Sequence, residues 1–254
     1  MCYSRVGSSH PDPMDLSVVI PVYNEAENIE ALFLEVKQAL AGRFGFEVVF
    51  VDDGSTDETV ERLTALAALH PELRVVRHTV NCGQSAAILS GVRAAQAAWI
   101  ATLDGDGQND PADIPSLVAR AREGANETPP LAMVAGHRRR RQDTWRKRMA
   151  SRIANAVRGR LLKDGTPDTG CGLKVFRRDV FLDLPYFDHM HRFLPALVRR
   201  AGFGVESMSV AHRPRRAGMS KYGVLDRLAV GIPDLLGVMW LNRRARRPQR
   251  SDTR

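Results

Sequence analysis

Acidic side chains crowd behind an apolar segment near the middle of the chain. The stretch WIATLDGDGQNDP, residues 99–111, carries Asp104, Asp106 and Asp110 directly after residues that read as a buried strand. Two carboxylates separated by one glycine can direct oxygens at a single cation, because Gly105 adds no side chain and permits unusual backbone angles. Mg²⁺ and Mn²⁺ prefer such oxygen ligands, and Mg²⁺ commonly keeps positions open for substrate phosphates. The spacing therefore indicates a divalent cation held against a diphosphate.

Other acidic or phosphate-binding motifs fit this stretch less well. An EF-hand calcium loop would need glycine where Asn109 stands and glutamate where Pro115 stands. No GxGxxG or GxxxxGK[ST] pattern follows a strand. A phosphatase with an aspartate nucleophile stays open from the two aspartates alone, although such a site normally lies on the first strand. Asp57 and Asp110 are expected to cap helices.

Strand-like and helix-like patterns alternate through the first half, as in a parallel sheet with crossover helices. The predicted strands are 16–22, 47–52, 73–78, 99–104 and 131–136, and a further strand is expected at 204–212, before a basic loop and a final helix. A helix is expected from about Glu27, with Ile29, Leu32, Phe33 and Val36 on one face. The next helix is expected after Ser55 or Thr56 as N-cap, with Glu58 as the capping-box partner. We predict an open, doubly wound, mostly parallel α/β sheet over about residues 15–140, with helices on both faces.

Polar side chains follow three of these strands. Ligands of doubly wound sheets bind beyond the carboxyl ends of the strands. Those ends carry Pro21, Tyr23, Asn24 and Glu25, then Asp52, Asp53, Gly54 and Ser55, then Asp104, Asp106 and Gln108. The sequence therefore predicts one polar rim that serves as the binding site.

Charge divides the chain into two unequal parts. The net charge is +8, yet residues 1–137 hold nine basic and 19 acidic residues, against 28 and 10 in the remainder. The basic runs at 137–148 and 242–250 point to an anionic partner. The three cysteines form no CxxC pair, which argues against a disulfide framework or a structural metal and favours a reducing compartment. Residues 1–14 lack the apolar segment of a signal peptide and are expected to form a disordered tail.

Seven segments together resemble one known family. They are SVVIPVYNEAENI (17–29), VVFVDDGSTDET (48–59), NCGQSAAILSGVRAA (81–95), LDGDGQNDP (103–111), DTGCGLKVFRR (168–178), MHRFLPAL (190–197) and RPRRAGMSKYG (213–223). In order and spacing they resemble family 2 glycosyltransferases, and among these the dolichyl-phosphate mannose synthase-like branch, over about residues 16–241. The resemblance implies a GT-A fold, a nucleotide-sugar donor such as GDP-mannose or UDP-glucose, Mg²⁺ or Mn²⁺, and inversion at the anomeric carbon.

The same resemblance implies roles for individual residues. The donor-binding positions are Pro21, Tyr23, Glu25, Asp52, Asp53, Asp104, Gly105, Asp106 and Gln108, of which Asp104, Asp106 and Gln108 hold the metal. The phosphate-binding and acceptor-binding positions are Arg138, Arg215, Ser220 and Lys221. The catalytic candidates are Asp104, Asp106, Arg215, Lys221 and Asp168.

The nature of the acceptor decides whether a base is needed. A polyprenyl phosphate is already an anion, so its attack needs no general base. A soluble or glycan hydroxyl would need one, and Asp168, Asp188 and His191 are the candidates. A catalytically silent anion-binding module is a third reading. Nucleic acid is not expected as a partner, because the basic stretches lack an aromatic stacking platform.

Two amphipathic stretches favour contact with an anionic membrane surface. Residues 224–241 are interrupted by Asp226, Arg227 and Asp234, so they do not form an uninterrupted transmembrane span. Apolar residues follow helical spacing in two stripes, Leu225, Leu228, Ile232, Leu235, Leu236 and Met239 before Trp240, and Trp145, Met149, Ile153, Val157 and Leu161. Basic helices with a terminal tryptophan suit the lipid interface, and ordinary core packing is the alternative.

These patterns predict how the chain is organised. A glycosyltransferase domain is expected over 15–223, with a nucleotide-binding half at about 15–137 and an acceptor-binding half at about 138–223. An amphipathic basic helix and tail would follow at 224–254. The expected location is cytoplasmic, peripherally on the inner face of a membrane.

Overall fold

A seven-stranded sheet organises the chain. The computed structural model describes residues 14–138, 158–162, 164–214 and 224–244. The strands are β1 (Leu16–Val22), β2 (Phe46–Asp52), β3 (Leu73–Arg77), β4 (Trp99–Thr102), β5 (Leu131–Arg138), β6 (Lys174–Arg177) and β7 (Gly204–Val210). Their order in the sheet is β3-β2-β1-β4-β6-β5-β7, and all pairings are parallel except those of β6 with β4 and β5.

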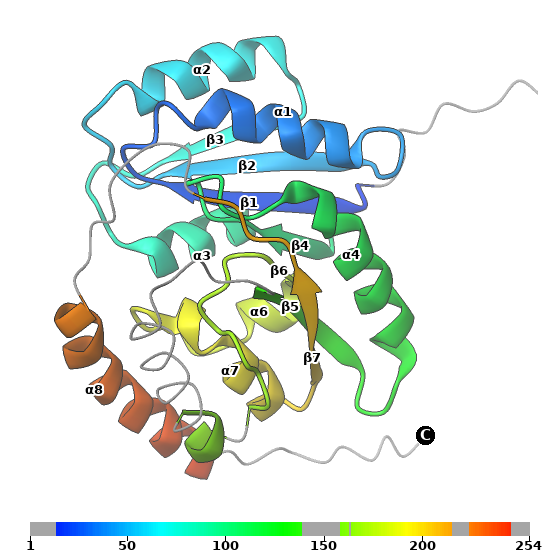
Figure 1. Ribbon diagram of the computed structural model, residues 1–254, viewed down its shortest axis with the longest axis vertical. Helices are drawn as coiled ribbons and strands as arrows, with labels where there is room; N and C mark the ends of the chain where they lie inside the picture. The colour runs from blue at the N-terminus through cyan, green and yellow to red at the C-terminus, as the bar shows by residue number, and fades with distance from the viewer. Residues whose placement is uncertain (1–13, 139–157, 163, 215–223, 245–254) are drawn as a thin grey trace, which may run out of the picture.

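Helices cover both faces of the sheet, which makes three layers (Figure 1). The α-helices are α1 (Ile29–Leu40), α2 (Thr59–Leu69), α3 (Gln84–Ala94), α4 (Ile114–Glu123), α6 (Arg178–Leu182), α7 (Leu194–Arg200) and α8 (Val224–Arg243). Residues 158–162 are also helical, and there are three short 3₁₀ helices in the described ranges: η1 (Pro111–Asp113), η2 (Gly124–Asn126) and η3 (Met190–Arg192). Helices α1, α2 and α4 pack on one face, whereas α3, α6, α7 and α8 pack on the other.

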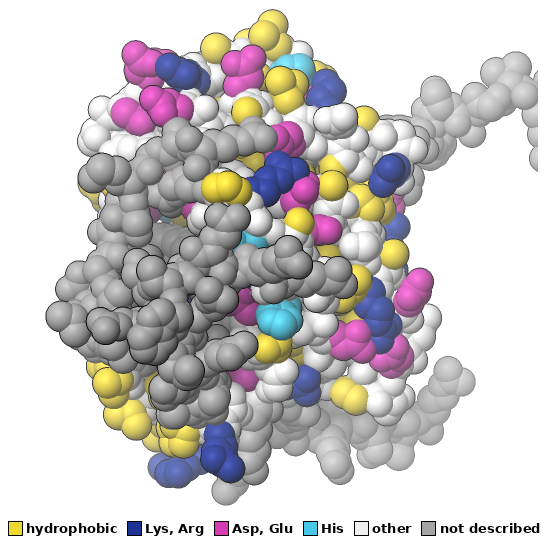
Figure 2. Space-filling model, in the orientation of Figure 1, with side chains coloured by type: hydrophobic (Ala, Val, Ile, Leu, Met, Phe, Trp, Pro, Cys, Tyr) yellow, Lys and Arg dark blue, Asp and Glu magenta, His cyan; other side chains and the backbone are white. Residues whose placement is uncertain are grey.

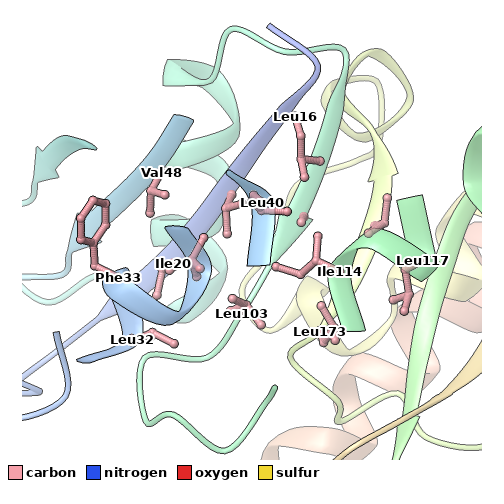
Figure 3. Packing of buried hydrophobic residues seen from close by; sticks show 14 of the residues in the cluster. Leu16, Ile20, Leu32, Phe33, Leu40, Val48, Leu103, Ile114, Leu117 and Leu173 are labelled. Carbon is pink, nitrogen blue, oxygen red and sulfur yellow. The ribbon is translucent and has the colours of Figure 1, made fainter. Parts of the chain in front are cut away.

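Valine-rich strands produce two hydrophobic cores from one sheet. Successive side chains of a strand point to opposite faces, so Val18 and Ile20 of β1 enter the core beneath α1 while Val19 enters the core beneath α3. Figure 3 shows the first of these cores, in which Phe33 of α1 packs with the strand residue Val48. Burial on both faces explains why these strands read as continuous apolar runs rather than as alternating ones.

The predicted doubly wound, mostly parallel architecture is confirmed, and the sheet is wider than expected. The sequence placed the sheet within about residues 15–140, but β6 enters antiparallel between β4 and β5, and β7 pairs with β5. Four residues, Lys174–Arg177, are too few for a periodic signal. The division into halves at residue 137 stays a prediction.

The expected N-cap of α2 at Ser55 or Thr56 is wrong. Helix α2 begins at Thr59, and the backbone N–H of Thr59 donates to Asp57 Oδ1 at 3.0 Å. Ser55 Oγ instead accepts from the backbone N–H of Asn24, at 2.9 Å. A hydroxyl that reads locally as a helix cap is therefore used to tie two neighbouring loops together. The capping expected of Asp110 is confirmed, because its Oδ1 accepts from the backbone of Ala112 at 3.0 Å.

Several predicted features lie outside the described residues. These are residues 1–13 of the expected tail, the stripe from Trp145 to Val157, and the phosphate-binding candidates Arg215, Ser220 and Lys221. The strand expected at 204–212 is β7, and the final helix is α8.

Candidate active site

The ends of four parallel strands and the start of one antiparallel strand share an edge of the sheet. Strands β1, β2, β4 and β5 run in one direction, so the residues that follow them meet at their carboxyl ends. Lys174, the first residue of antiparallel β6, pairs with Thr102, the last residue of β4. Residues 168–173 therefore arrive beside the acidic loop at 104–108, and this edge forms the predicted rim.

Asp104 lies in a tight setting between two segments. Gln84, the first residue of α3, donates from Nε2 to Asp104 Oδ1 at 2.8 Å. On the other side, a Cβ on Gly172 would stand 2.3 Å from Asp104 Cγ and Oδ2, so any side chain there would displace the Asp104 carboxylate. Burial raises the pKa of Asp104, and the negative charge of Asp106 raises it further. A bound cation would offset that repulsion, so the donor set fits a divalent ion.

Gly105 is required for space rather than for an unusual backbone angle. A Cβ on Gly105 would stand 2.7 Å from Val22 Cγ1 and 3.1 Å from the carbonyl oxygen of Pro21. The positive φ, 68°, belongs to Gly107 instead. Gly107 turns the chain so that the backbone N–H of Gln108 donates to Asp106 Oδ1 at 3.1 Å. The two glycines thus press the acidic loop onto the end of β1 and shape it.

A long-range contact joins the acidic loop to the chain that leaves β7. The backbone N–H of Arg213 donates to the carbonyl of Gln108 at 2.9 Å, and His212 forms an isolated bridge with Asn109. The Arg213 guanidinium pairs with Asp110 Oδ2 at 2.5 Å and with Glu35 Oε2 at 2.8 Å. These contacts fix residues 212 and 213, close to the end of the described range at 214, on the acidic loop.

Arg138 and Asp168 form a bidentate ion pair at the same rim. Arg138 Nε lies 2.6 Å from Asp168 Oδ2, and Arg138 Nη2 lies 2.8 Å from Asp168 Oδ1. Burial lowers the pKa of Arg138, but the hydrogen bonds and charge of Asp168 outweigh it and raise that pKa overall. Planar two-point pairing of this kind fixes the orientation of both groups.

Lys174 is a rim residue that the sequence analysis missed. Its side chain is buried, and its Nζ donates to the carbonyl of Cys171. Burial lowers the pKa of Lys174, whereas the nearby Cys171 and Asp104 act to raise it. A lysine inside the apolar run GLKVF was the available signal, because lysine is almost never buried without a partner.

Asp52 and Asp53 turn into the protein. Asp52 is fully buried, and its Oδ1 accepts from the backbone N–H of Ser55 at 3.2 Å. Asp53 accepts from the backbone N–H groups of Cys82, at 2.9 Å, and Gly83, at 2.8 Å. These carboxylates organise the loops after β2 and β3, while Pro21, Tyr23 and Glu25 stay partly exposed at the end of β1.

The remaining base candidates differ in their surroundings. His191 is half-buried with Nδ1 2.8 Å from Ser85 Oγ, and desolvation holds the pKa of His191 well below its usual range. The imidazole is therefore neutral near pH 7. Asp188 is exposed, and its carboxylate accepts from the backbone N–H of His189 at 2.7 Å.

Helix α8 divides its apolar residues between the core and the surface. Val238 is buried, and Leu235 and Met239 pack against the core formed by α3, α6 and α7. Ile232, Leu236 and Trp240, spaced four residues apart, are 56%, 60% and 59% exposed. Figure 2 shows hydrophobic side chains with Lys or Arg side chains beside them over the lower part of α8. Core packing is therefore confirmed for one side of the helix, while contact of the exposed side with a membrane surface stays a prediction.

No helix within the described ranges combines the length and apolar character needed to cross a bilayer.

The sheet, its covering helices and the acidic rim define an α/β domain of the GT-A glycosyltransferase type. The chain belongs to glycosyl transferase family 2, whose family model matches residues 17–184. The resemblance drawn from the seven segments is thereby confirmed.

Two relatives illustrate the branch. The chain is 36% identical over 248 residues to dodecaprenyl-phosphate galacturonate synthase of Rhizobium johnstonii, covering 95% of this chain and 72% of that protein. It is 36% identical over 214 residues to undecaprenyl-phosphate 4-deoxy-4-formamido-L-arabinose transferase of Serratia proteamaculans, covering 83% and 63%. The chain thus spans about two thirds of the length of these relatives.

Solved structures match at the level of the fold. Glucosyl-3-phosphoglycerate synthase from Mycobacterium tuberculosis, in complex with Mn²⁺, UDP and glucosyl-3-phosphoglycerate, superposes with a TM-score of 0.67 at 20% identity. The match covers 90% of this chain and 80% of that one. The same enzyme has also been solved with Mg²⁺ and UDP.

Proposed function

We propose that this chain transfers a sugar, with inversion, from a nucleoside-diphosphate sugar to a polyprenyl phosphate at a membrane surface. Both relatives are named for sugar transfer to a polyprenyl phosphate. The observation that carries the proposal is the hydrogen bond from the backbone N–H of Arg213 to the carbonyl of Gln108, because it holds the last described residues before Arg215 on the acidic loop. In the sequence, the phosphate-binding candidates begin two residues after this contact.

The donor half of the site is the acidic loop with the ends of β1 and β2. Asp104, Asp106 and Gln108 would hold Mg²⁺ or Mn²⁺. When bound, the ion would stabilise the negative charge that develops on the leaving diphosphate. Donor contacts are proposed for Pro21, Tyr23, Glu25, Asp52, Asp53, Asp104, Gly105, Asp106 and Gln108. Burial and then the negative charge of Asp106 raise the pKa of Asp104, and a cation bound between the two carboxylates would favour their ionised forms.

The acceptor half is basic, as an anionic acceptor requires. Arg138, held in one orientation by Asp168, would receive the acceptor phosphate together with Arg215, Ser220 and Lys221. A phosphate oxygen attacks as an anion, so no residue has to remove a proton. The pairing of Asp168 with Arg138 and the low pKa of His191, which makes its imidazole a weak base, agree with an acceptor that needs no base.

Helix α8 is proposed as the membrane contact. Its row of Ile232, Leu236 and Trp240 faces outward, and Arg243 and Arg244 follow at its end. Apolar side chains with a tryptophan and flanking arginines suit the interface of an anionic leaflet, on the inner face of the membrane. Each arginine contributes about 1 kcal/mol there, so replacing Arg243 and Arg244 by glutamine should weaken binding about 30-fold.

Flotation with vesicles tests this contact. The chain should float with vesicles that contain anionic lipid and remain below with neutral ones, and Trp240→Ser should reduce flotation. A matched control is Leu69→Ser, since Leu69 is 75% exposed at the end of α2, away from α8. Equal loss in both variants would contradict a specific role for α8.

Identification of the donor is the first test of the reaction. Nucleotide sugars of the GDP-mannose and UDP-glucose types, together with uronic acid donors, are screened for thermal stabilisation with and without Mn²⁺. The productive donor should stabilise the chain only with the ion, and Asp106→Asn should abolish the effect. Asp183→Asn, an exposed position after α6, is the control.

Transfer to a short polyprenyl phosphate is then compared with transfer to a panel of hydroxyl acceptors. The proposal requires Mn²⁺-dependent transfer to the lipid phosphate that is lost in Asp106→Asn. If transfer occurs only to hydroxyl acceptors, the proposal that the acceptor is a lipid phosphate is wrong. Salt-sensitive binding of nucleic acid without transfer to any acceptor would overturn the enzymatic reading.

A further inference from the structure

Three metal-binding side chains from two connecting loops converge next to the donor half of the rim. Asp53 follows β2, His78 follows β3, and Cys82 precedes α3. One oxygen of Asp53, one ring nitrogen of His78 and the sulfur of Cys82 all lie within 4.8 Å of one another. The thiol is exposed, so an ion has a route from solvent.

The surrounding hydrogen bonds orient this cluster. Asp53 Oδ1 accepts from the backbone N–H of Cys82 and Asp53 Oδ2 from that of Gly83, which leaves a lone pair on Oδ2. His78 Nδ1 lies 2.7 Å from Asp53 Oδ1, and His78 Nε2 lies 2.9 Å from Ser90 Oγ. A histidine whose second nitrogen has a hydrogen-bond partner is the usual arrangement at a metal, because that partner fixes the tautomer.

We propose that Asp53, His78 and Cys82 form a transition-metal site, with Zn²⁺ as its representative ion, separate from the cation site at Asp104 and Asp106. Thiolate and imidazole ligands select Zn²⁺ over Mg²⁺, whereas paired carboxylates select the harder ions. Zn²⁺ takes three protein ligands and leaves a fourth position for water.

Proton balance follows from the ligand set. On binding, the Cys82 thiol releases its proton to solvent. His78 Nδ1 lies 2.7 Å from the acceptor Asp53 Oδ1, so it carries the ring proton in the metal-free protein. On binding, Nδ1 releases this proton to solvent and Nε2 takes one up, so that Ser90 Oγ changes from donor to acceptor and the Nδ1 lone pair is directed at the ion.

An occupied site would regulate the donor half. The ion would pin the loop at 78–83 to the end of β2 and engage Asp53, which we assign to the donor. Zn²⁺ should then raise the apparent KM for the donor; this consequence rests on the proposed function, whereas metal binding itself does not.

Metal binding is measured on the full chain by competition with a chromophoric chelator and by Co²⁺ absorption. Co²⁺ should give an intense thiolate-to-cobalt charge-transfer band in the near ultraviolet. The variants Cys82→Ser and His78→Gln should lose the band and the Zn²⁺ affinity. Cys2→Ser, which removes another of the three thiols, should keep both. Ser90→Ala should weaken Zn²⁺ binding about 10-fold.

Alkylation of the unsubstituted chain gives a second measurement that does not depend on variant folding. Zn²⁺ should slow the reaction of Cys82 with iodoacetamide, followed by peptide mass spectrometry, and Mg²⁺ should not. Asp106→Asn should retain this protection of Cys82 by Zn²⁺. The same variant should lose the Mn²⁺-dependent thermal stabilisation by the donor. Unprotected Cys82, or equal Zn²⁺ affinity in Cys82→Ser, would overturn the site and leave the transferase proposal intact.

Discussion

Replacing Gly172 by alanine should damage the cation site without changing any proposed ligand. The added Cβ would stand 2.3 Å from Asp104 Oδ2, and ordinary contact begins at 3.4 Å, so the groups must separate by about 1 Å. Hydrogen bonds restrain the movement of both residues. Gln84 Nε2 donates to Asp104 Oδ1, and Thr102 Oγ1 donates to the Gly172 carbonyl at 2.7 Å. A misplacement of about 1 Å costs roughly 100-fold, or about 2.7 kcal/mol in transition-state stabilisation.

Calorimetric titration with Mn²⁺ measures the effect independently of the donor, and Mn²⁺-dependent transfer measures it once the donor is known. Gly237→Ala is the matched control: a Cβ at Gly237 meets nothing within 4 Å, so Mn²⁺ binding should be unchanged. Thermal unfolding of Gly172→Ala checks that the fold persists. A folded Gly172→Ala variant with unchanged Mn²⁺ affinity would refute the role assigned to Asp104.

Three further predictions concern the carboxylates of Asp104 and Glu47 and the glycine turn at Gly54. Folding raises the pKa of Asp104, so stability falls as pH rises through the shifted range; Asp104→Asn should raise the unfolding temperature at pH 7 without metal, with no gain at low pH where Asp104 is protonated. Glu47 is buried and accepts from Ser17 Oγ at 2.6 Å, so Glu47→Ala should cost about 3 kcal/mol in urea unfolding. Gly54 has φ 75° and its Cβ would stand 2.6 Å from the Val80 carbonyl carbon, so Gly54→Ala should destabilise by about 1 kcal/mol or more in the same assay.

Local patterns predicted most of the sheet. The valine runs of β1 and β2 are buried on both faces, which makes them recognisable without any knowledge of their neighbours. The stripe Ile29, Leu32, Phe33 and Val36 is likewise confirmed as the buried face of α1. Strand β6 escaped prediction because its four residues gain their strand conformation from β4 and β5 on either side.

Residue types alone did not predict which contacts Ser55 and Gly105 make. Ser55 reads as a helix cap and instead accepts from Asn24, 31 residues earlier. Gly105 reads as a flexible turn and instead provides room beside Val22. In both cases a segment distant in the sequence decides the role of the residue. The intrinsic propensity of a residue type contains no information about that segment.

The sequence by itself determined where acidic and basic groups follow the strands, because strand ends and their spacing are local properties. Only the tertiary structure decided which of these groups meet. Arg138 finds Asp168, 30 residues away, and Gln108 finds Arg213, 105 residues away, because β5, β6 and β7 lie side by side in an order unlike their order in the chain. Contact between such distant residues depends on sheet topology, which no short stretch of sequence contains.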